Sequence, residues 1–245
     1  MIPEITKRNI GAVTMIDLKG SLSGQWASRG CEQLKKALNG ANGNQVIVNL
    51  KRTVDMDTLG LKGFLNLAAD HKIGIIPGNQ SVMDLFSQYP ETQFELIKDE
   101  QELAERYGKQ MIQVKDESNN RHEIRVQTVL GVKFQFYYED EVIECIGIVT
   151  NLSENGFYIQ YIDTNTIEHS LQVSDASLIH EITFSVYLPN GRALQGKGEV
   201  VHQESEHEQL GLGVKMTKLN AAHGIILSRY LNQQIETKNS EKAGG

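Results

Sequence analysis

Residues 132–139, VKFQFYYE, show the residue pattern that is typical of the second half of the chain. Its apolar residues Val132, Phe134 and Phe136 alternate with polar ones, and a period of two places them on one face of a β-strand. The same alternation returns in ITFSVYL at 182–188 and in LGLGVKM at 210–216. This half of the chain is therefore predicted to be mostly β.

The strand-like runs after residue 125 follow one another without a helix between them. Asn190-Gly191, just after the run at 182–188, suits a tight hairpin because both residues tolerate a positive φ. Roughly six such strands remove their exposed edges by closing into a small antiparallel barrel. We therefore expect a six-stranded antiparallel β-barrel, closed by a C-terminal helix at about 219–235.

The first half of the chain alternates strand and helix instead. Strand-like runs at 12–18 and 45–50 are separated by a helical stretch at 25–38, and a second amphipathic helix begins near residue 58. Shorter strand and helix signals continue to about residue 107. This order predicts an α/β domain over residues 1–107.

The segment between the two halves, GKQMIQVKDESNN at 108–120, is mostly polar and has no sustained period. We expect it to be an interdomain linker, with the second domain spanning 121–235. The last residues, ETKNSEKAGG at 236–245, have almost no apolar content and are predicted to be a disordered tail.

The composition limits the classes of partner. The chain has 245 residues, 40% of them hydrophobic and 22% charged, which suits two globular domains. The net charge of -7 disfavours general attraction to DNA or RNA, so a bound nucleotide would need a local basic site. No stretch reaches the ~18 apolar residues of a membrane helix, and a cytoplasmic location without membrane insertion is expected.

Two polar motifs stand out in the second half: RHEIR at 121–125 and NLSENG at 151–156. Arg121 and Arg125 carry guanidinium groups, which can fork onto phosphate oxygens or onto guanine O6 and N7. Asn151 and Ser153 offer short polar groups, and Gly156 permits close approach or a positive φ. Taken separately, the motifs could be a solvated basic pair and a plain turn.

In this order and spacing, the segment 121–235 resembles the PilZ domain, the bacterial receptor module for cyclic di-GMP. The resemblance implies that Arg121, Arg125, Asn151, Ser153 and Gly156 bind cyclic di-GMP, and that motility, biofilm or transcription is controlled. Many members of that family have a basic or bulky apolar residue before the first arginine, where this chain has Asn120. The number of ligand molecules bound is therefore left open.

In the first half, Asp57-Thr58-Leu59-Gly60-Leu61 opens a helix after the strand QVIVNL, and residues 1–107 resemble a STAS domain, the fold of anti-sigma-factor antagonists. The phosphoacceptor position of that family falls on Leu59, which has no hydroxyl. Thr58 could take a phosphate in its place, or could simply satisfy amides at the start of the helix. The resemblance implies a docking surface for an unidentified protein partner or for a second copy in a homodimer.

The sequence lacks the common catalytic and metal-binding motifs. It has no H-E-x-x-H, no paired C-x-x-C, no phosphate-binding G-x-x-x-x-G-K-[ST] loop and no G-x-S-x-G elbow, so we expect a non-enzyme without metal or cofactor. The leading hypothesis is a cyclic di-GMP receptor that couples nucleotide binding to protein interaction through the STAS-like domain. A nucleotide-independent scaffold with a degenerate PilZ domain is the alternative, and a phosphate-handling enzyme is a third.

Overall fold

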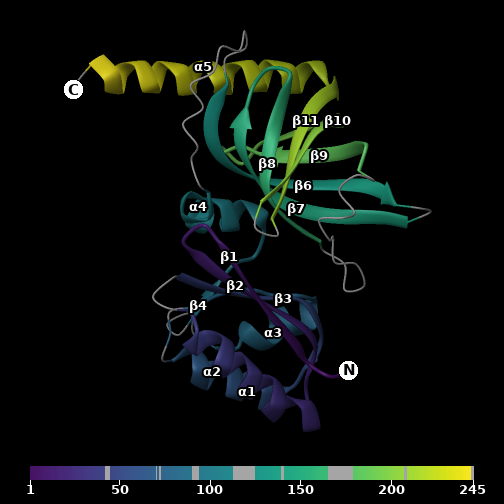
Figure 1. Ribbon diagram of the computed structural model, residues 1–245. Helices are drawn as coiled ribbons and strands as arrows, with labels where there is room; N and C mark the ends of the chain where they lie inside the picture. The colour runs from purple at the N-terminus through teal and green to yellow at the C-terminus, as the bar shows by residue number, and fades with distance from the viewer. Residues whose placement is uncertain are drawn as a thin grey trace. The chain divides into compact units, whose positions relative to one another are not determined.

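The computed structural model describes residues 1–41, 45–69, 71, 73–89, 94–112, 125–138, 141–164, 179–206 and 209–243 (Figure 1). The described residues form two compact units, which divide between Glu102 and Leu103. The predicted combination of an α/β unit with a closed antiparallel barrel is confirmed.

The first unit is built on a five-stranded sheet with the order β1-β2-β3-β4-β5. β1 runs antiparallel to β2, whereas the other neighbours are parallel. Its elements are β1 (Glu4–Ile10), β2 (Val13–Leu22), α1 (Gln25–Asn39), β3 (Gln45–Met56), α2 (Thr58–Ala68), β4 (Ile73–Ile76), α3 (Gln80–Phe86) and β5 (Phe94–Leu96).

A single apolar core joins the sheet to α1, α2 and α3. The apolar residues of the amphipathic helix expected near residue 58, which is α2, are all buried there: Leu61, Phe64, Leu65 and Ala68. Phe86 of α3 lies edge-on to Phe64, with the ring centroids 5.4 Å apart. The period of the helices in the sequence therefore correctly indicated the face that packs on the sheet.

Short polar side chains set the starts of α2 and α3. Asp57 caps α2, because its Oδ1 accepts a hydrogen bond of 2.8 Å from the backbone N–H of Gly60. Asn79 caps α3 through a bond of 2.9 Å from the N–H of Val82. Each cap satisfies an amide that has no partner inside its helix.

Helix α4 (Glu100–Met111) begins at the end of the first unit, and from Leu103 onward it belongs to the second unit. Gly108 lies so close to Val129 that a Cβ at this position would collide with the valine side chain. The boundary predicted at residue 107 and the first residues of the predicted linker therefore fall inside a helix that packs on the barrel. Residues 113–120 of that linker lie outside the described residues.

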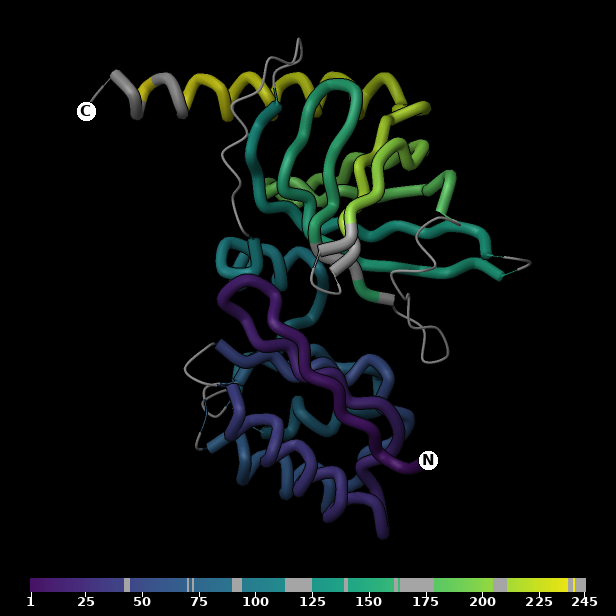
Figure 2. The backbone as a smooth tube through the Cα atoms, in the orientation of Figure 1, coloured from purple at the N-terminus to yellow at the C-terminus, as the bar shows by residue number. Residues whose placement is uncertain are grey.

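The second unit is a closed barrel with the strand order β10-β11-β8-β7-β6-β9. Figure 2 shows how β6 closes the barrel against β9, a strand distant from it in the sequence. The strands are β6 (Val126–Tyr138), β7 (Glu141–Leu152), β8 (Gly156–Thr164), β9 (Glu181–Tyr187), β10 (Ala193–Glu206) and β11 (Gln209–Leu219).

The interior of the barrel contains the apolar residues that the alternation predicted. Val132, Phe134 and Phe184 are at most 2% exposed. Phe157 meets Phe184 edge-on, with ring centroids 4.8 Å apart. The predicted Asn190-Gly191 turn joins β9 to β10, and Gly191 has a φ of 74°.

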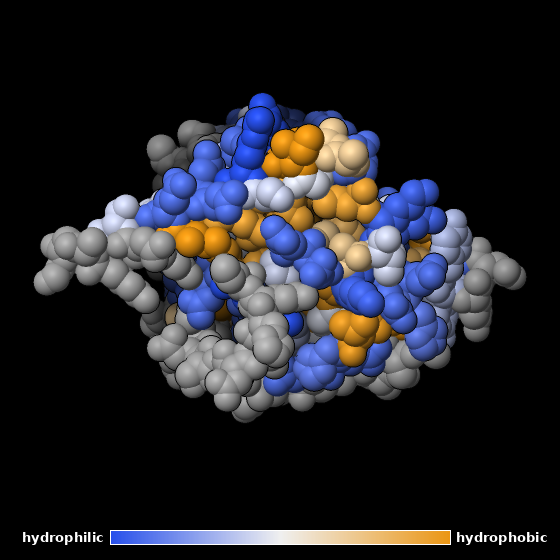
Figure 3. Space-filling view, turned by 90° about the horizontal axis from the view of Figure 1, so that it is seen from above, coloured by the Kyte–Doolittle hydropathy of each residue, from blue (hydrophilic) through white to orange (hydrophobic). Residues whose placement is uncertain are grey.

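Helix α5 (Ala221–Ala243) lies across the barrel (Figure 1). Its residues Leu227, Tyr230 and Leu231 are buried against the barrel core. The Tyr230 hydroxyl is 2.7 Å from Thr128 Oγ1 of β6. Seen from this side, the surface is largely hydrophilic, with small separate apolar areas (Figure 3).

The structure corrects the expectation of a disordered tail at 236–245, because α5 continues to Ala243. The sequence from 236 to 243 contains no glycine or proline to end the helix, and glutamate, lysine and alanine all favour its continuation. The two last glycines, at 244 and 245, lie outside the described residues.

Candidate functional site

The NLSENG segment forms a tight connection between β7 and β8, and Ser153 holds it together. The Ser153 hydroxyl donates to the Gly156 carbonyl at 3.1 Å and accepts from the Gly156 N–H at 3.2 Å. The Ser153 N–H donates to the same carbonyl at 2.8 Å. Ser153 is only 4% exposed, so its hydroxyl is committed to the turn.

Gly156 lies against the backbone of β11. A Cβ at this position would collide with the Val214 carbonyl oxygen and would lie 3.4 Å from the carbonyl carbon. The φ of Gly156 is not in the left-handed region. Of the two reasons considered for a glycine here, the structure therefore supports close approach and not a positive φ.

Asn151 and Arg125 come together through the pairing of β6 with β7. Val126 is the partner of Leu152, and Gln127 is the partner of Asn151. Arg125, the last residue of the RHEIR motif, directly precedes Val126 and is exposed. The structure thus brings the end of one motif beside the start of the other. Arg121 and Asn120 lie outside the described residues.

Asn151 is half-buried and belongs to a row of residues that runs across the outer face of the barrel. Its partner on β8 is Tyr158, which pairs in turn with Gly213 on β11, and Gly213 pairs with His202 on β10. Their neighbours Leu152 and Phe157 point into the core instead. The row extends the candidate site by two polar side chains, those of Tyr158 and His202.

Sequence analysis did not single out Tyr158 and Lys215, which lie next to the motif. The Tyr158 hydroxyl donates to Glu204 Oε2 at 2.8 Å, and the same hydroxyl oxygen lies directly over Gly211. Lys215 is exposed and is the register partner of Gly156. The alternation in LGLGVKM already indicated that Lys215 faces outward, but not that its strand adjoins the NLSENG turn.

Thr58 is the first residue of α2 and is exposed. The capping role considered for it belongs to Asp57, whose Oδ2 also accepts from the Gly24 N–H at 2.8 Å. The backbone N–H groups of Gly24 and then Gly60 lower the pKa of Asp57. Leu59, next to Thr58, is 61% exposed.

Within the described ranges, no group of three His, Cys, Asp or Glu side chains is placed to hold a metal ion. None of the helices in those ranges is long and apolar enough to cross a membrane.

The chain was compared with known proteins at the level of sequence and of structure. No family model matches it, and the search of curated proteins finds no match. Among solved structures, it is similar to the inhibitor of motility MotI/DgrA of Bacillus subtilis, with 16% identity and a TM-score of 0.36 over 53% of this chain and 56% of that one. It is also similar to YcgR of Escherichia coli in complex with c-di-GMP, with 12% identity and a TM-score of 0.34 over 51% of this chain and 50% of that one.

The third similar structure is the unphosphorylated anti-sigma factor antagonist SpoIIAA, with 17% identity and a TM-score of 0.30 over 44% of this chain and 97% of that one. These neighbours are PilZ proteins and a STAS-fold antagonist, the two classes named by the sequence resemblance. The match spans only about half the length of the first two structures. Similarity at this level carries no argument about ligands, and so the function has to be argued from the site.

Proposed function

We propose that this chain is a cyclic di-GMP receptor whose barrel holds the nucleotide between the RHEIR and NLSENG motifs. The observation that carries the proposal is the register of β6 and β7, in which Val126 pairs with Leu152. This register brings Arg125 next to the turn that contains Ser153.

The residues have different roles in this proposal. Arg121 and Arg125 bind phosphate and guanine through their guanidinium groups. Asn151 presents an amide to a base or ribose edge from the outer face of the barrel, while Ser153 and Gly156 build the turn. Lys215 adds a positive charge beside Gly156.

Binding is coupled to protein interaction through the segment that carries the arginines. This segment joins β6 to α4, and α4 leads back to the first unit. Contacts of Arg121 and Arg125 with a nucleotide would therefore restrict α4, through which the chain passes from one unit to the other. The first unit would then present its partner surface differently with and without nucleotide. The cytoplasmic location and the role in binding rather than turnover are part of this proposal.

The test is calorimetric titration of the full chain with cyclic di-GMP. Arg125→Ala and Arg121→Ala should each weaken binding at least tenfold, about 1.4 kcal/mol, because each removes a charge-assisted contact. Arg192→Ala is the matched control, since Arg192 is exposed in the turn between β9 and β10. It should bind like the parent protein.

Melting curves of the three variants should coincide with that of the parent, which separates loss of ligand contacts from loss of fold. The absence of binding heat and of ligand-induced stabilisation in the parent would refute the receptor proposal. Pull-down of a partner that is unaffected by the nucleotide would then support the scaffold alternative.

A further inference from the structure

Strand β1 is an edge of the sheet in the first unit. Among the described residues it pairs only with β2, and the sheet order places it at one end. An edge strand presents a row of backbone N–H and C=O groups that can pair with another extended chain. The opposite edge, β5, is much shorter, because it spans only Phe94–Leu96.

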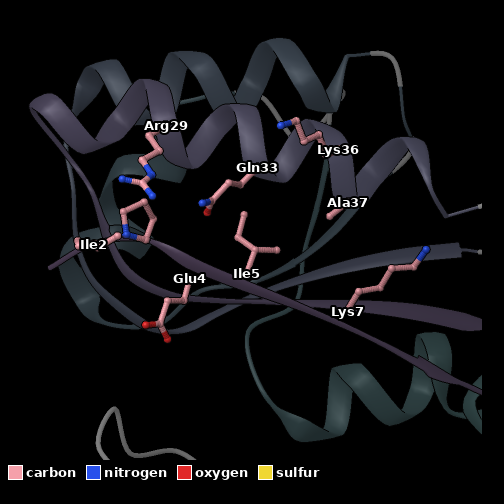
Figure 4. Close-up of a pocket in the computed structure, with 9 residues that line it drawn as sticks. Ile2, Glu4, Ile5, Lys7, Arg29, Gln33, Lys36 and Ala37 are labelled. Carbon is pink, nitrogen blue, oxygen red and sulfur yellow. The ribbon is translucent and has the colours of Figure 1, made fainter.

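A groove of about 450 Å³ runs between this edge and helix α1 (Figure 4). Its lining comes from the start of the chain and from one face of α1. The residues that line it are Ile2, Pro3, Glu4, Ile5, Lys7, Arg29, Gln33, Lys36 and Ala37. A groove between an edge strand and a helix is the geometry in which several domains bind an extended peptide as an added strand.

The groove also contains a polar atom that needs a partner. Gln33 Oε1 is buried and accepts no hydrogen bond from any described residue. In Figure 4 the Gln33 amide points from α1 toward Ile5 on β1. A buried acceptor without a donor is costly, and rotation of the Gln33 side chain into the groove would let a backbone N–H of a bound chain satisfy it.

The charges around the groove are mainly positive. Lys7, Arg29 and Lys36 line it and are exposed, whereas Glu4 is the one acidic residue in the lining. The Glu4 carboxylate points away from α1 (Figure 4), and Lys7 Nζ donates to the Gly40 carbonyl just after the helix. No carboxylate of the lining therefore lies between a bound chain and the side chains of Arg29 and Lys36.

We propose that this groove binds an extended acidic segment of a partner protein, which adds to the sheet as a strand beside β1. Carboxylates at alternate positions of the segment would meet Arg29 and Lys36, and apolar residues between them would cover Ile5 and Ala37. The groove would thus be the surface through which the first unit binds its partner in the proposed function. The binding itself needs no nucleotide, so each of the two proposals can fail without the other.

The probe for the test is a display library of random decapeptides, panned over the immobilised full chain. The enriched peptides should carry Asp or Glu alternating with apolar residues. The most enriched peptide is then synthesised with a fluorescent label, and its binding is measured by anisotropy. The affinity of the peptide should fall strongly as the salt concentration rises, as expected for attraction between exposed charges.

Arg29→Glu/Lys36→Glu should reduce binding of this peptide at least tenfold. Lys35→Glu/Lys62→Glu is the matched control, because it changes the net charge equally at exposed positions that do not line the groove. A copy of the peptide N-methylated at alternate residues should also lose binding, because strand addition requires backbone N–H groups.

Three results would overturn the proposal: enrichment of peptides that are not acidic, equal binding by the two double variants, or equal binding of the methylated peptide. Self-association of the chain that the Arg29→Glu/Lys36→Glu variant abolishes would overturn it too, since the occupant would then be a second copy.

Discussion

Replacing Gly156 by alanine should destabilise the barrel even when no nucleotide is present. The new methyl group would collide with the carbonyl oxygen of Val214 and would lie 3.5 Å from the Cα of Lys215. Both neighbours are backbone atoms of β11, and they cannot move aside as the end of a side chain could. Relief requires separation of β8 from β11 at the position where they pair.

The expected cost is that of inserting a methyl group into a packed interior, about 1–3 kcal/mol. Unstrained contacts between carbon atoms lie at ~3.5–4.0 Å, and the new methyl group would be well below that distance from the Val214 oxygen. Gly224→Ala is the matched control, because a Cβ there would meet nothing within 4 Å and the residue lies in α5. That change should stabilise the chain by roughly 0.8–1 kcal/mol through higher helix propensity.

Urea unfolding followed by far-UV circular dichroism measures both changes in the full chain. The chain has one tryptophan, Trp26 in α1, so its fluorescence reports on the first unit separately. Gly156→Ala should lower the midpoint of the barrel transition, and Gly224→Ala should raise it. An unchanged barrel midpoint in Gly156→Ala would refute the reasoning, because the glycine would then not be required for packing.

Two further changes test local hydrogen bonds. In the first, Asp57→Asn leaves one oxygen to accept from the amides of Gly24 and Gly60, whereas the carboxylate uses two oxygens. The pKa of Asp57 is lowered in the folded protein, so the carboxylate stabilises the fold at pH values above its ordinary pKa of ~3.9. This stabilisation is lost as the pH falls through the folded-state pKa. The difference in unfolding free energy between parent and variant should therefore shrink below about pH 4 in urea titrations, and a constant difference would contradict this. In the second, Tyr230→Phe removes the 2.7 Å bond to Thr128 and should cost about 0.5–1.5 kcal/mol in thermal unfolding. Addition of Thr128→Val should then cost little more, and fully additive losses would count against the bond.

The barrel could be predicted because its strands bury one face and expose the other. Phe134 and Phe184 alternate with polar residues and are at most 2% exposed. Strand β1 was missed because it lies at an edge, where Ile5 is only partly buried and most of its neighbours are charged or polar. Without a fully buried face, an edge strand shows no clear period of two in its sequence.

The neighbours of the candidate site could not be predicted in the same way. Alternation shows that Tyr158 and Lys215 face outward, but it does not show which strands adjoin. Their positions beside Asn151 and Gly156 follow from the pairing of β8 with β7 and with β11. That pairing depends on barrel closure, which involves residues far apart in the sequence.

Two residues of the NLSENG motif, Ser153 and Gly156, build the turn itself. Ser153 uses its hydroxyl as both donor and acceptor toward Gly156, and Gly156 is required for the approach of β8 to β11. Substitution of either residue would therefore weaken the turn as well as any ligand contact. Loss of nucleotide binding in such variants therefore does not show that the substituted residue contacts the nucleotide. Arg125, by contrast, is exposed and contributes little to the core. Substitution of Arg125 is therefore decisive for the receptor proposal, because ligand recognition at this residue is separable from the fold.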